Sequence, residues 1–166
     1  MRPAYLYHVT WQRSLRGIAE RGLLASGSGG IAPAGYAAHA RGRLFATGAR
    51  GVLFWFGRSE DHASDRSDNP IGDGYTPVVL RLPDYRRRSE DDLGTRDAFA
   101  PAYIMRRGRV APTLIDLWDG RRWLPVARWR RLDPKIGYTF EDDDGETLAW
   151  FKPAMQNPLL PKVYPW

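Results

Sequence analysis

Short apolar runs separated by turn residues recur along most of this chain of 166 residues. Runs of about four to eight residues that are rich in β-branched and aromatic side chains are typical of strands. The clearest run has Val-Val-Leu at its centre and is followed by Pro83. We therefore predict short strands over residues 4–10, 44–47, 75–82, 103–105, 113–118, 123–126, 138–140 and 147–151.

The 3.6-residue spacing of an amphipathic helix appears over residues 14–21, where Leu15 and Ile18 share one face. Ser14 is the predicted N-cap of this helix, because its hydroxyl can accept a bond from a free backbone N–H. Gly22 stands where a C-cap glycine belongs. The sequence thus predicts one short helix after the first strand.

An aromatic run that contains Trp55 predicts a second, mostly buried helix over residues 49–58. Residues 26–35 and 59–74 are rich in Gly, Ser, Asp and Pro. These residues favour turns over regular structure, so we expect loops in both places.

Strands outnumber helices in this pattern and mostly follow one another along the chain, which favours antiparallel sheets. The Asp119-Gly120 pair predicts a hairpin, and the acidic run at residues 142–146 predicts a second one. No repeat or linker divides the chain. We therefore expect a single α+β domain over residues 1–166, with the proline-rich residues 152–166 as an irregular strap.

The composition excludes several kinds of site. The chain has no cysteine, which rules out a disulfide framework, a thiolate zinc site and a cysteine nucleophile. Its three histidines, His8, His39 and His62, lack the spacing of metal ligands, so we predict no metal. No apolar run approaches the length of a membrane span or a signal peptide. We expect a cytoplasmic protein without a membrane partner, although export by a dedicated secretion system stays compatible with the sequence.

The net charge of +6 is unevenly distributed. Residues 1–50 contain seven Arg and only one acidic residue, Glu20. A basic segment of this kind can meet the phosphates of a dinucleotide or of a nucleic acid. Arginine also outnumbers lysine 22 to 3 over the whole chain, which a coding preference for arginine would equally explain. Charge alone therefore leaves the partner open.

Four features occur in a particular order: Leu-Tyr-His-Val-Thr, a short helix, Leu-Phe-Ala-Thr, and a helix with Trp55. This order resembles the histidine-type branch of the ADP-ribosyltransferase superfamily, which includes diphtheria-toxin-like enzymes, poly-ADP-ribose polymerases, rifamycin-modifying transferases and RNA 2′-phosphotransferases. The resemblance covers roughly residues 4–60. It implies split antiparallel sheets with a few short helices, and NAD as the substrate.

The resemblance also implies roles for single residues. His8 and Thr10 would hold the ribose of the nicotinamide nucleoside, since a neutral imidazole offers one donor and one acceptor. Phe45 stands where the family usually has tyrosine, and Thr47 closes the same motif. Phe45 and Trp55 would lie on either side of the nicotinamide ring.

Members of the family use an acidic residue, normally glutamate, to stabilise the positive charge that develops on the ribose as nicotinamide leaves. The acidic cluster of Glu90, Asp91 and Asp92 is the first candidate here, and Asp97 is the second. Where other members carry glutamate before an aromatic residue, this chain has Ala102. The sequence therefore leaves the catalytic acid open.

Strand alternation makes the expected cleft specific. His8 and Thr10 should share one face of their strand, with His8 partly open to solvent, while Tyr7 and Val9 pack on the other face.

Arg41 and Arg43 precede the second motif, where they could bind the pyrophosphate of NAD. The resemblance thus predicts a transferase that passes ADP-ribose from NAD to a protein, nucleic acid or small molecule. Such stand-alone domains are often toxins or anti-defence factors. The departures at Phe45 and Ala102 keep a second hypothesis open: a catalytically inactive module of the same fold that binds NAD, RNA or a protein.

Overall fold

The computed structural model of the chain describes the residues 5–25, 43–48, 52–70, 72–84, 89–91, 102–105, 108–119 and 122–132. Its strands are β1 (Tyr5–Trp11), β2 (Leu23–Leu24), β3 (Leu44–Thr47), β4 (Pro77–Pro83), β5 (Ser89–Asp91), β6 (Ala102–Met105), β7 (Arg109–Val110), β8 (Asp116–Trp118) and β9 (Trp123–Pro125). Its helices are η1 (Gln12–Ser14), α1 (Leu15–Arg21), α3 (Val52–Ser64), η6 (Pro112–Leu114) and η7 (Val126–Arg131), where η marks a 3-10 helix.

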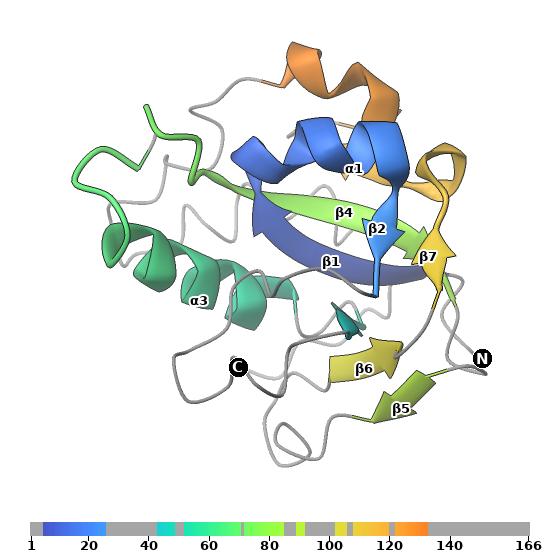
Figure 1. Cartoon of the computed structure of the whole chain (residues 1–166). Helices are drawn as coiled ribbons and strands as arrows, with labels where there is room; N and C mark the ends of the chain where they lie inside the picture. The colour runs from blue at the N-terminus through green and yellow to red at the C-terminus, as the bar shows by residue number, and fades with distance from the viewer. Residues whose placement is uncertain are drawn as a thin grey trace.

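Every strand pairing in the described residues is antiparallel. Seven strands form one sheet in the order β5-β6-β3-β1-β4-β8-β9, and β2 pairs with β7 in a second, two-stranded sheet. Few and short helices accompany these sheets (Figure 1). The chain therefore has the α+β architecture with antiparallel sheets that the strand pattern predicts.

The large sheet is nearly divided between β1 and β3. β1 pairs with β4 along its whole length, from Tyr5↔Pro83 to Trp11↔Pro77. By contrast, β1 and β3 share a single pair of Cα partners, Tyr7↔Thr47. The sheet thus consists of two halves, β5-β6-β3 and β1-β4-β8-β9, and Figure 1 shows β5 and β6 set below β1 and β4.

The first face of the β1 half-sheet carries the aliphatic core. Residues directly opposite each other in a ladder share a face, so Leu6 and Leu82 lie on this face, as do His8 and Leu80. α1 and η7 cover the first face, because their apolar side chains belong to the same buried cluster as these leucines. The cluster consists of Leu6, Leu15, Ile18, Leu23, Ala25, Leu44, Ala46, Val78, Leu80, Leu82, Met105, Val110, Ile115, Leu117, Val126 and Leu132.

The second face of this half-sheet is aromatic. Tyr7 and Trp11 alternate with the residues of the first face along β1. Trp11 donates its indole N–H to the carbonyl oxygen of Ser59 on α3 at 3.1 Å, which fixes α3 against this face. The ring centroids of Tyr7 and Trp123 are 5.9 Å apart, and those of Trp118 and Trp123 are 5.1 Å apart. Both faces are therefore covered, by different elements.

The predicted first helix is present as α1, but its entry differs from the prediction. Ser14 has helical backbone angles, its side chain makes no capping bond, and a 3-10 turn precedes it. Ser14 is the N-cap residue of α1, as predicted, but the expected capping bond is absent, because the turn Gln12–Ser14 leads the strand directly into the helix. Gly22 does act as the C-cap, with φ of 81° and a backbone N–H that donates to Ile18.

The second helix is longer than predicted. The sequence indicated an end near residue 58 and a loop over residues 59–74, whereas α3 continues to Ser64. Four buried positions, spaced by four, three and four residues, form its packed stripe: Val52, Phe56, Ser59 and Ala63. Small and polar members of this stripe concealed its helical period. The buried Ser59 hydroxyl finds its partner within the helix, since it donates to the carbonyl of Trp55 at 2.7 Å.

Further differences concern the second half of the chain. Residues 113–115 were expected in a strand, but a 3-10 turn begins at Pro112. The backbone N–H of Ile115 donates to the carbonyl of Pro112 and closes this turn. Val126 was expected to end a strand, and it begins η7 instead. The strands β2, β5 and β7 were not predicted, because two or three residues are too few to show a period.

The hairpin predicted at Asp119 is confirmed. β8 and β9 are antiparallel neighbours with Trp118 opposite Trp123. Asp119 accepts the backbone N–H of Arg122 through its side chain at 2.8 Å, the local bond that favours Asp at turns. The predictions for residues 26–35, 138–140, 147–151 and 152–166 lie outside the described residues.

Candidate functional site

His8 stands at the junction of the two half-sheets. It lies at the middle of β1, next to Tyr7, which forms the one pair with β3. Its ring is partly buried, and its Nδ1 lies 2.7 Å from the carbonyl oxygen of Phe45 on β3. The imidazole therefore bridges the two halves where the backbone ladder between them is nearly absent.

This bond selects the tautomer of a neutral His8 ring. A carbonyl oxygen only accepts, so Nδ1 carries the proton, and in the neutral ring Nε2 is left with a lone pair. Burial lowers the pKa of His8 below the ordinary value of 6.5, against an opposing effect of the Phe45 carbonyl, which favours the charged form. The structure thus favours a neutral His8 that presents a hydrogen-bond acceptor at Nε2.

The lowered pKa of His8 predicts a dependence of stability on pH. In the unfolded chain His8 binds a proton below about pH 6.5, whereas in the folded protein His8 binds it only at a lower pH. Acidification below 6.5 should therefore favour unfolding, and His8→Asn should reduce this loss because asparagine does not titrate. Urea unfolding at pH 7.5 and 5.5 measures the effect. An equal loss of stability in wild type and His8→Asn would contradict the lowered pKa.

The two threonines of the motifs are buried. Thr10 shares the first face with His8, two residues along β1, and is 8% exposed. Thr47 lies opposite Tyr7 and is 2% exposed. Alternation from this pair places Thr47 on the second face, so the structure brings Thr10 next to His8 and sets Thr47 on the other side.

Phe45 meets His8 through its backbone. Its carbonyl accepts the His8 bond, and its side chain is partly buried. Phe45 is two residues from Thr47, so alternation assigns its ring to the second face, away from His8. Arg43, directly before β3, is partly buried. Whether His8, Phe45 and Arg43 contact the same ligand therefore stays a prediction.

Trp55 lies in the first half of α3 and is partly buried. The helix packs against the second face through Trp11 and Ser59. The structure therefore brings Trp55 to the face that alternation assigns to Phe45, whereas His8 projects from the first face. A nicotinamide ring held between Phe45 and Trp55 stays a prediction.

The pattern expected along β1 differs from the observed one in one respect. Tyr7 is buried and His8 partly exposed, as expected, but Val9 is only partly buried. The aliphatic core lies on the His8 face, because α1 covers it. The alternation itself was predicted correctly, and the position of the main core was not.

Two residues of the acidic cluster, Glu90 and Asp91, lie on β5 at the edge of the other half-sheet. In β5, Glu90 stands in register with Ile104 of β6, which in turn pairs with Phe45 of β3. Asp91 stands in register with Tyr103. Since neighbouring strands are about 4.8 Å apart, the β5 backbone is roughly 10 Å from β3. A ligand that contacted both His8 and this cluster would have to span the β3 half-sheet. The remaining predicted residues Arg41, Asp92 and Asp97 lie outside the described residues.

Ala102 begins β6 directly opposite Thr47. It therefore lies two strands from β1, closer to His8 in the sheet order than β5 is. At this position, where the resemblance places a glutamate, the chain offers a methyl group. This position therefore does not supply the acid that the resemblance implies.

One polar cluster was not found from the sequence. Arg81 and Asp116 stand opposite each other on β4 and β8, joined by Nη2–Oδ2 and Nε–Oδ2 bonds of 2.6 and 3.1 Å. The Arg81 guanidinium also lies over the rings of Tyr5 and Trp123, at 4.4 and 4.7 Å from their centroids. This pairing depends on the strand register, so no local sequence signal reveals it. Through these contacts Arg81 of β4 connects β8 and β9 to β1 on the second face.

Within the described parts of the chain, no group of three or more His, Cys, Asp and Glu side chains is arranged to hold a metal ion. Over the same residues, no helix has both the length and the apolar character needed to cross a bilayer.

The chain matches no protein-family model, no curated protein and no solved structure.

Proposed function

We propose that the protein is an NAD-dependent ADP-ribosyltransferase, which cleaves the nicotinamide–ribose bond and passes ADP-ribose to an acceptor. One observation carries this proposal. A neutral His8 sits at the junction of two half-sheets, where its Nδ1–H donates to the Phe45 carbonyl and its Nε2 is able to accept a hydrogen bond. The His-x-Thr order of the first strand and the Leu-Phe-Ala-Thr strand beside it support the same function by resemblance.

In the proposed reaction, His8 orients the ribose and takes no part in breaking the bond. A ribose hydroxyl donates to Nε2 of His8, which fixes the sugar relative to the sheet. The C1′–N bond then breaks, and its electron pair leaves with nicotinamide, which becomes neutral. Positive charge develops on the ribose, and a carboxylate on the opposite side stabilises it until the acceptor nucleophile attacks C1′.

An acidic residue among Glu90, Asp91 and Asp92 is the proposed source of this carboxylate. Glu90 and Asp91 lie on β5, which belongs to the half-sheet that includes β3. An NAD molecule bound along this half-sheet would lie between His8 and the acidic edge. Arg43 is the proposed contact for the pyrophosphate, because guanidinium groups bind phosphate oxygens bidentately. We propose that such a transferase acts in the cytoplasm as a toxin or an anti-defence factor.

Nicotinamide release from NAD tests the function. Purified protein is incubated with NAD, and free nicotinamide is measured against time and protein concentration. We expect release in proportion to protein, and a loss of about a hundredfold in one of the variants Glu90→Gln, Asp91→Asn and Asp92→Asn, as typical for removal of one electrostatic group. Release at the rate of buffer alone would refute catalysis.

A second candidate function is NAD binding without turnover. The chain has Phe45 and Ala102 at the two positions where the resemblance implies tyrosine and glutamate. Loss of the acid removes charge stabilisation while leaving the ribose contact at His8 in place. Calorimetric titration with NAD separates the two candidates, since binding without nicotinamide release supports the inactive module. Absence of binding would exclude both.

A further inference from the structure

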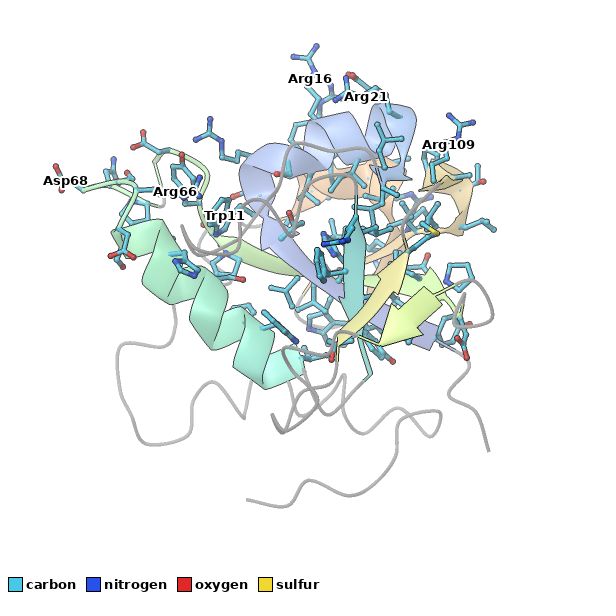
Figure 2. All side chains as sticks on the ribbon, turned by 60° about the horizontal axis from the view of Figure 1, so that its bottom comes forward. Trp11, Arg16, Arg21, Arg66, Asp68 and Arg109 are labelled. Carbon is cyan, nitrogen blue, oxygen red and sulfur yellow. The ribbon has the colours of Figure 1, made fainter. Side chains whose placement is uncertain are left out.

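Exposed arginines gather on α1, β7 and η7, and we call these six residues the arginine surface. They are Arg16, Arg21, Arg109, Arg128, Arg130 and Arg131. Figure 2 shows Arg16, Arg21 and Arg109 extending outward from the same side of the molecule. The exposed acidic residue on these elements is Glu20, bonded to Arg16 at 3.1 Å. The surface therefore carries a strong excess of positive charge.

The three elements that carry these arginines adjoin one another. α1 and η7 pack together through the apolar cluster, to which Leu15 and Val126 both contribute. β7 pairs with β2, the strand that follows α1, so that Arg109 stands opposite Leu24. The arginines thus come from segments far apart in sequence and share one side of the fold. A coding preference for arginine explains their number but not their clustering.

Among the described residues, five of these six arginines form no ion pair, and the sixth, Arg16, is bonded to Glu20. Arg81 is paired with Asp116, and Arg122 lies 3.7 Å from a carboxylate oxygen of Asp119. Unneutralised like charges repel one another in the free protein, and a polyanion removes that repulsion.

We propose that the arginine surface binds the phosphodiester backbone of a nucleic acid. Guanidinium groups match phosphate oxygens in geometry and charge, and such contacts release counterions from the polyanion. Trp129 packs in part against the aliphatic core and is partly exposed, with the Arg130 guanidinium 5.0 Å from its ring centroid. A base can stack on the exposed Arg130 guanidinium, as bases do on arginine side chains.

An anionic membrane is the other polyanion that such a surface could meet. Insertion into a bilayer requires exposed apolar side chains beside the basic ones. Among the described residues, the exposed large hydrophobic residue is Leu114, at 56%. A single such residue does not make an apolar face. The observations therefore favour a nucleic acid, and they do so whether or not the protein acts on NAD.

Fluorescence anisotropy with labelled oligonucleotides of about 20 nucleotides tests this proposal, with single-stranded RNA, single-stranded DNA and duplex DNA as separate arms. The double variant Arg21→Gln/Arg109→Gln is compared with Arg66→Gln/Arg122→Gln, which removes the same charge elsewhere. Figure 2 shows Arg66 beside Trp11, away from the labelled arginines of the surface. Circular dichroism and thermal unfolding check that both variants are folded.

We expect wild type to bind at least one oligonucleotide with an affinity that falls steeply as salt rises. Six phosphate contacts to a single strand would give a slope of about −4 in log K against log salt, and two lost contacts would reduce it by about 1.4. The surface variant should bind about tenfold or more weakly near 0.1 M salt, and the control within about twofold of wild type. Nicotinamide release should be the same in all three proteins.

Three results would overturn the proposal. The first is the absence of oligonucleotide binding at low salt. The second is equal weakening by the two double variants, which would show a response to net charge alone. The third is tighter binding to phosphatidylserine vesicles than to any oligonucleotide, which would identify a lipid surface as the partner.

Discussion

Gly22→Ala is expected to lower the free energy of unfolding by about 3 kcal/mol, the sum of two separate effects. Gly22 has φ of 81° and ψ of −175°, a region that residues with a side chain essentially never adopt. A Cβ on Gly22 would also overlap the backbone carbonyl oxygen of Val110 on β7. The carbonyl belongs to the β2–β7 ladder, where Val110 pairs with Leu23, so it cannot simply move aside.

Gly108→Ala is the matched control for this substitution. Gly108 has φ of 95°, but a Cβ there would meet no atom within 4 Å. Its expected cost is therefore the backbone strain alone, about 1 kcal/mol. Urea unfolding of both variants measures the difference. Equal destabilisation by the two alanines would show that the contact with Val110 contributes nothing, contrary to the overlap expected between a Cβ at residue 22 and the Val110 carbonyl.

A pair of His8 variants should separate the two nitrogens of the ring. The amide nitrogen of asparagine can take the place of Nδ1 and keep the bond to Phe45. The asparagine side chain has no atom at the position of Nε2. Glutamine is longer, and its amide oxygen can reach the position of Nε2 as an acceptor. We expect His8→Asn to lower kcat/KM for nicotinamide release by about ten- to a hundredfold, or about 1.4 to 2.7 kcal/mol, and His8→Gln to restore part of it.

Stability measurements distinguish this effect from simple unfolding. Both His8 variants should remain folded at pH 7.5, because the Phe45 carbonyl keeps a donor in His8→Asn. Equal activities in wild type and His8→Asn would remove His8 from the site. A loss of activity in His8→Gln greater than that in His8→Asn would show that the bond to Phe45, and not the acceptor at Nε2, is what matters.

Local patterns in the sequence predicted the elements whose signal lies within a few residues. The run around Val78 and Val79 gave β4, and the glycine after residue 21 gave the end of α1. Asp119 gave the hairpin, because its side chain bonds to the turn that it forms. In each case the residue acts on its own neighbours, so no knowledge of the rest of the fold is needed.

Features that depend on distant pairing could not be predicted in the same way. The two-residue strand β2 exists because β7 pairs with it across a gap of more than 80 residues in the chain. Ser59 and Ala63 appear polar or small in sequence, and only the packing of α3 against Trp11 shows that they are buried. The same holds for the pair of Arg81 and Asp116, which the β4–β8 register brings together.

The candidate site falls between these two cases. Alternation along β1 correctly placed His8 and Thr10 on one face of the strand and Tyr7 on the other, and the structure places His8 at the junction of the half-sheets. The sequence did not predict that the His8 ring would bond to the backbone carbonyl of Phe45. It also did not predict that the Phe45 side chain would lie on the opposite face from His8. Main-chain bonds carry no side-chain signature, so a sequence pattern cannot reveal them.

Nitrogen NMR of the histidine rings, with and without saturating NAD, tests the central claim most directly. The His8 signals are identified by their loss in His8→Asn, and those of His62 by a second variant. In the free protein at pH 7.5 we expect Nδ1 of His8 to be protonated and Nε2 to be the acceptor. On addition of NAD, Nε2 should shift as expected for an accepted hydrogen bond, while Nδ1 keeps its proton. His8 signals that stay unchanged at saturating NAD, or a free protein with the proton on Nε2, would contradict the account.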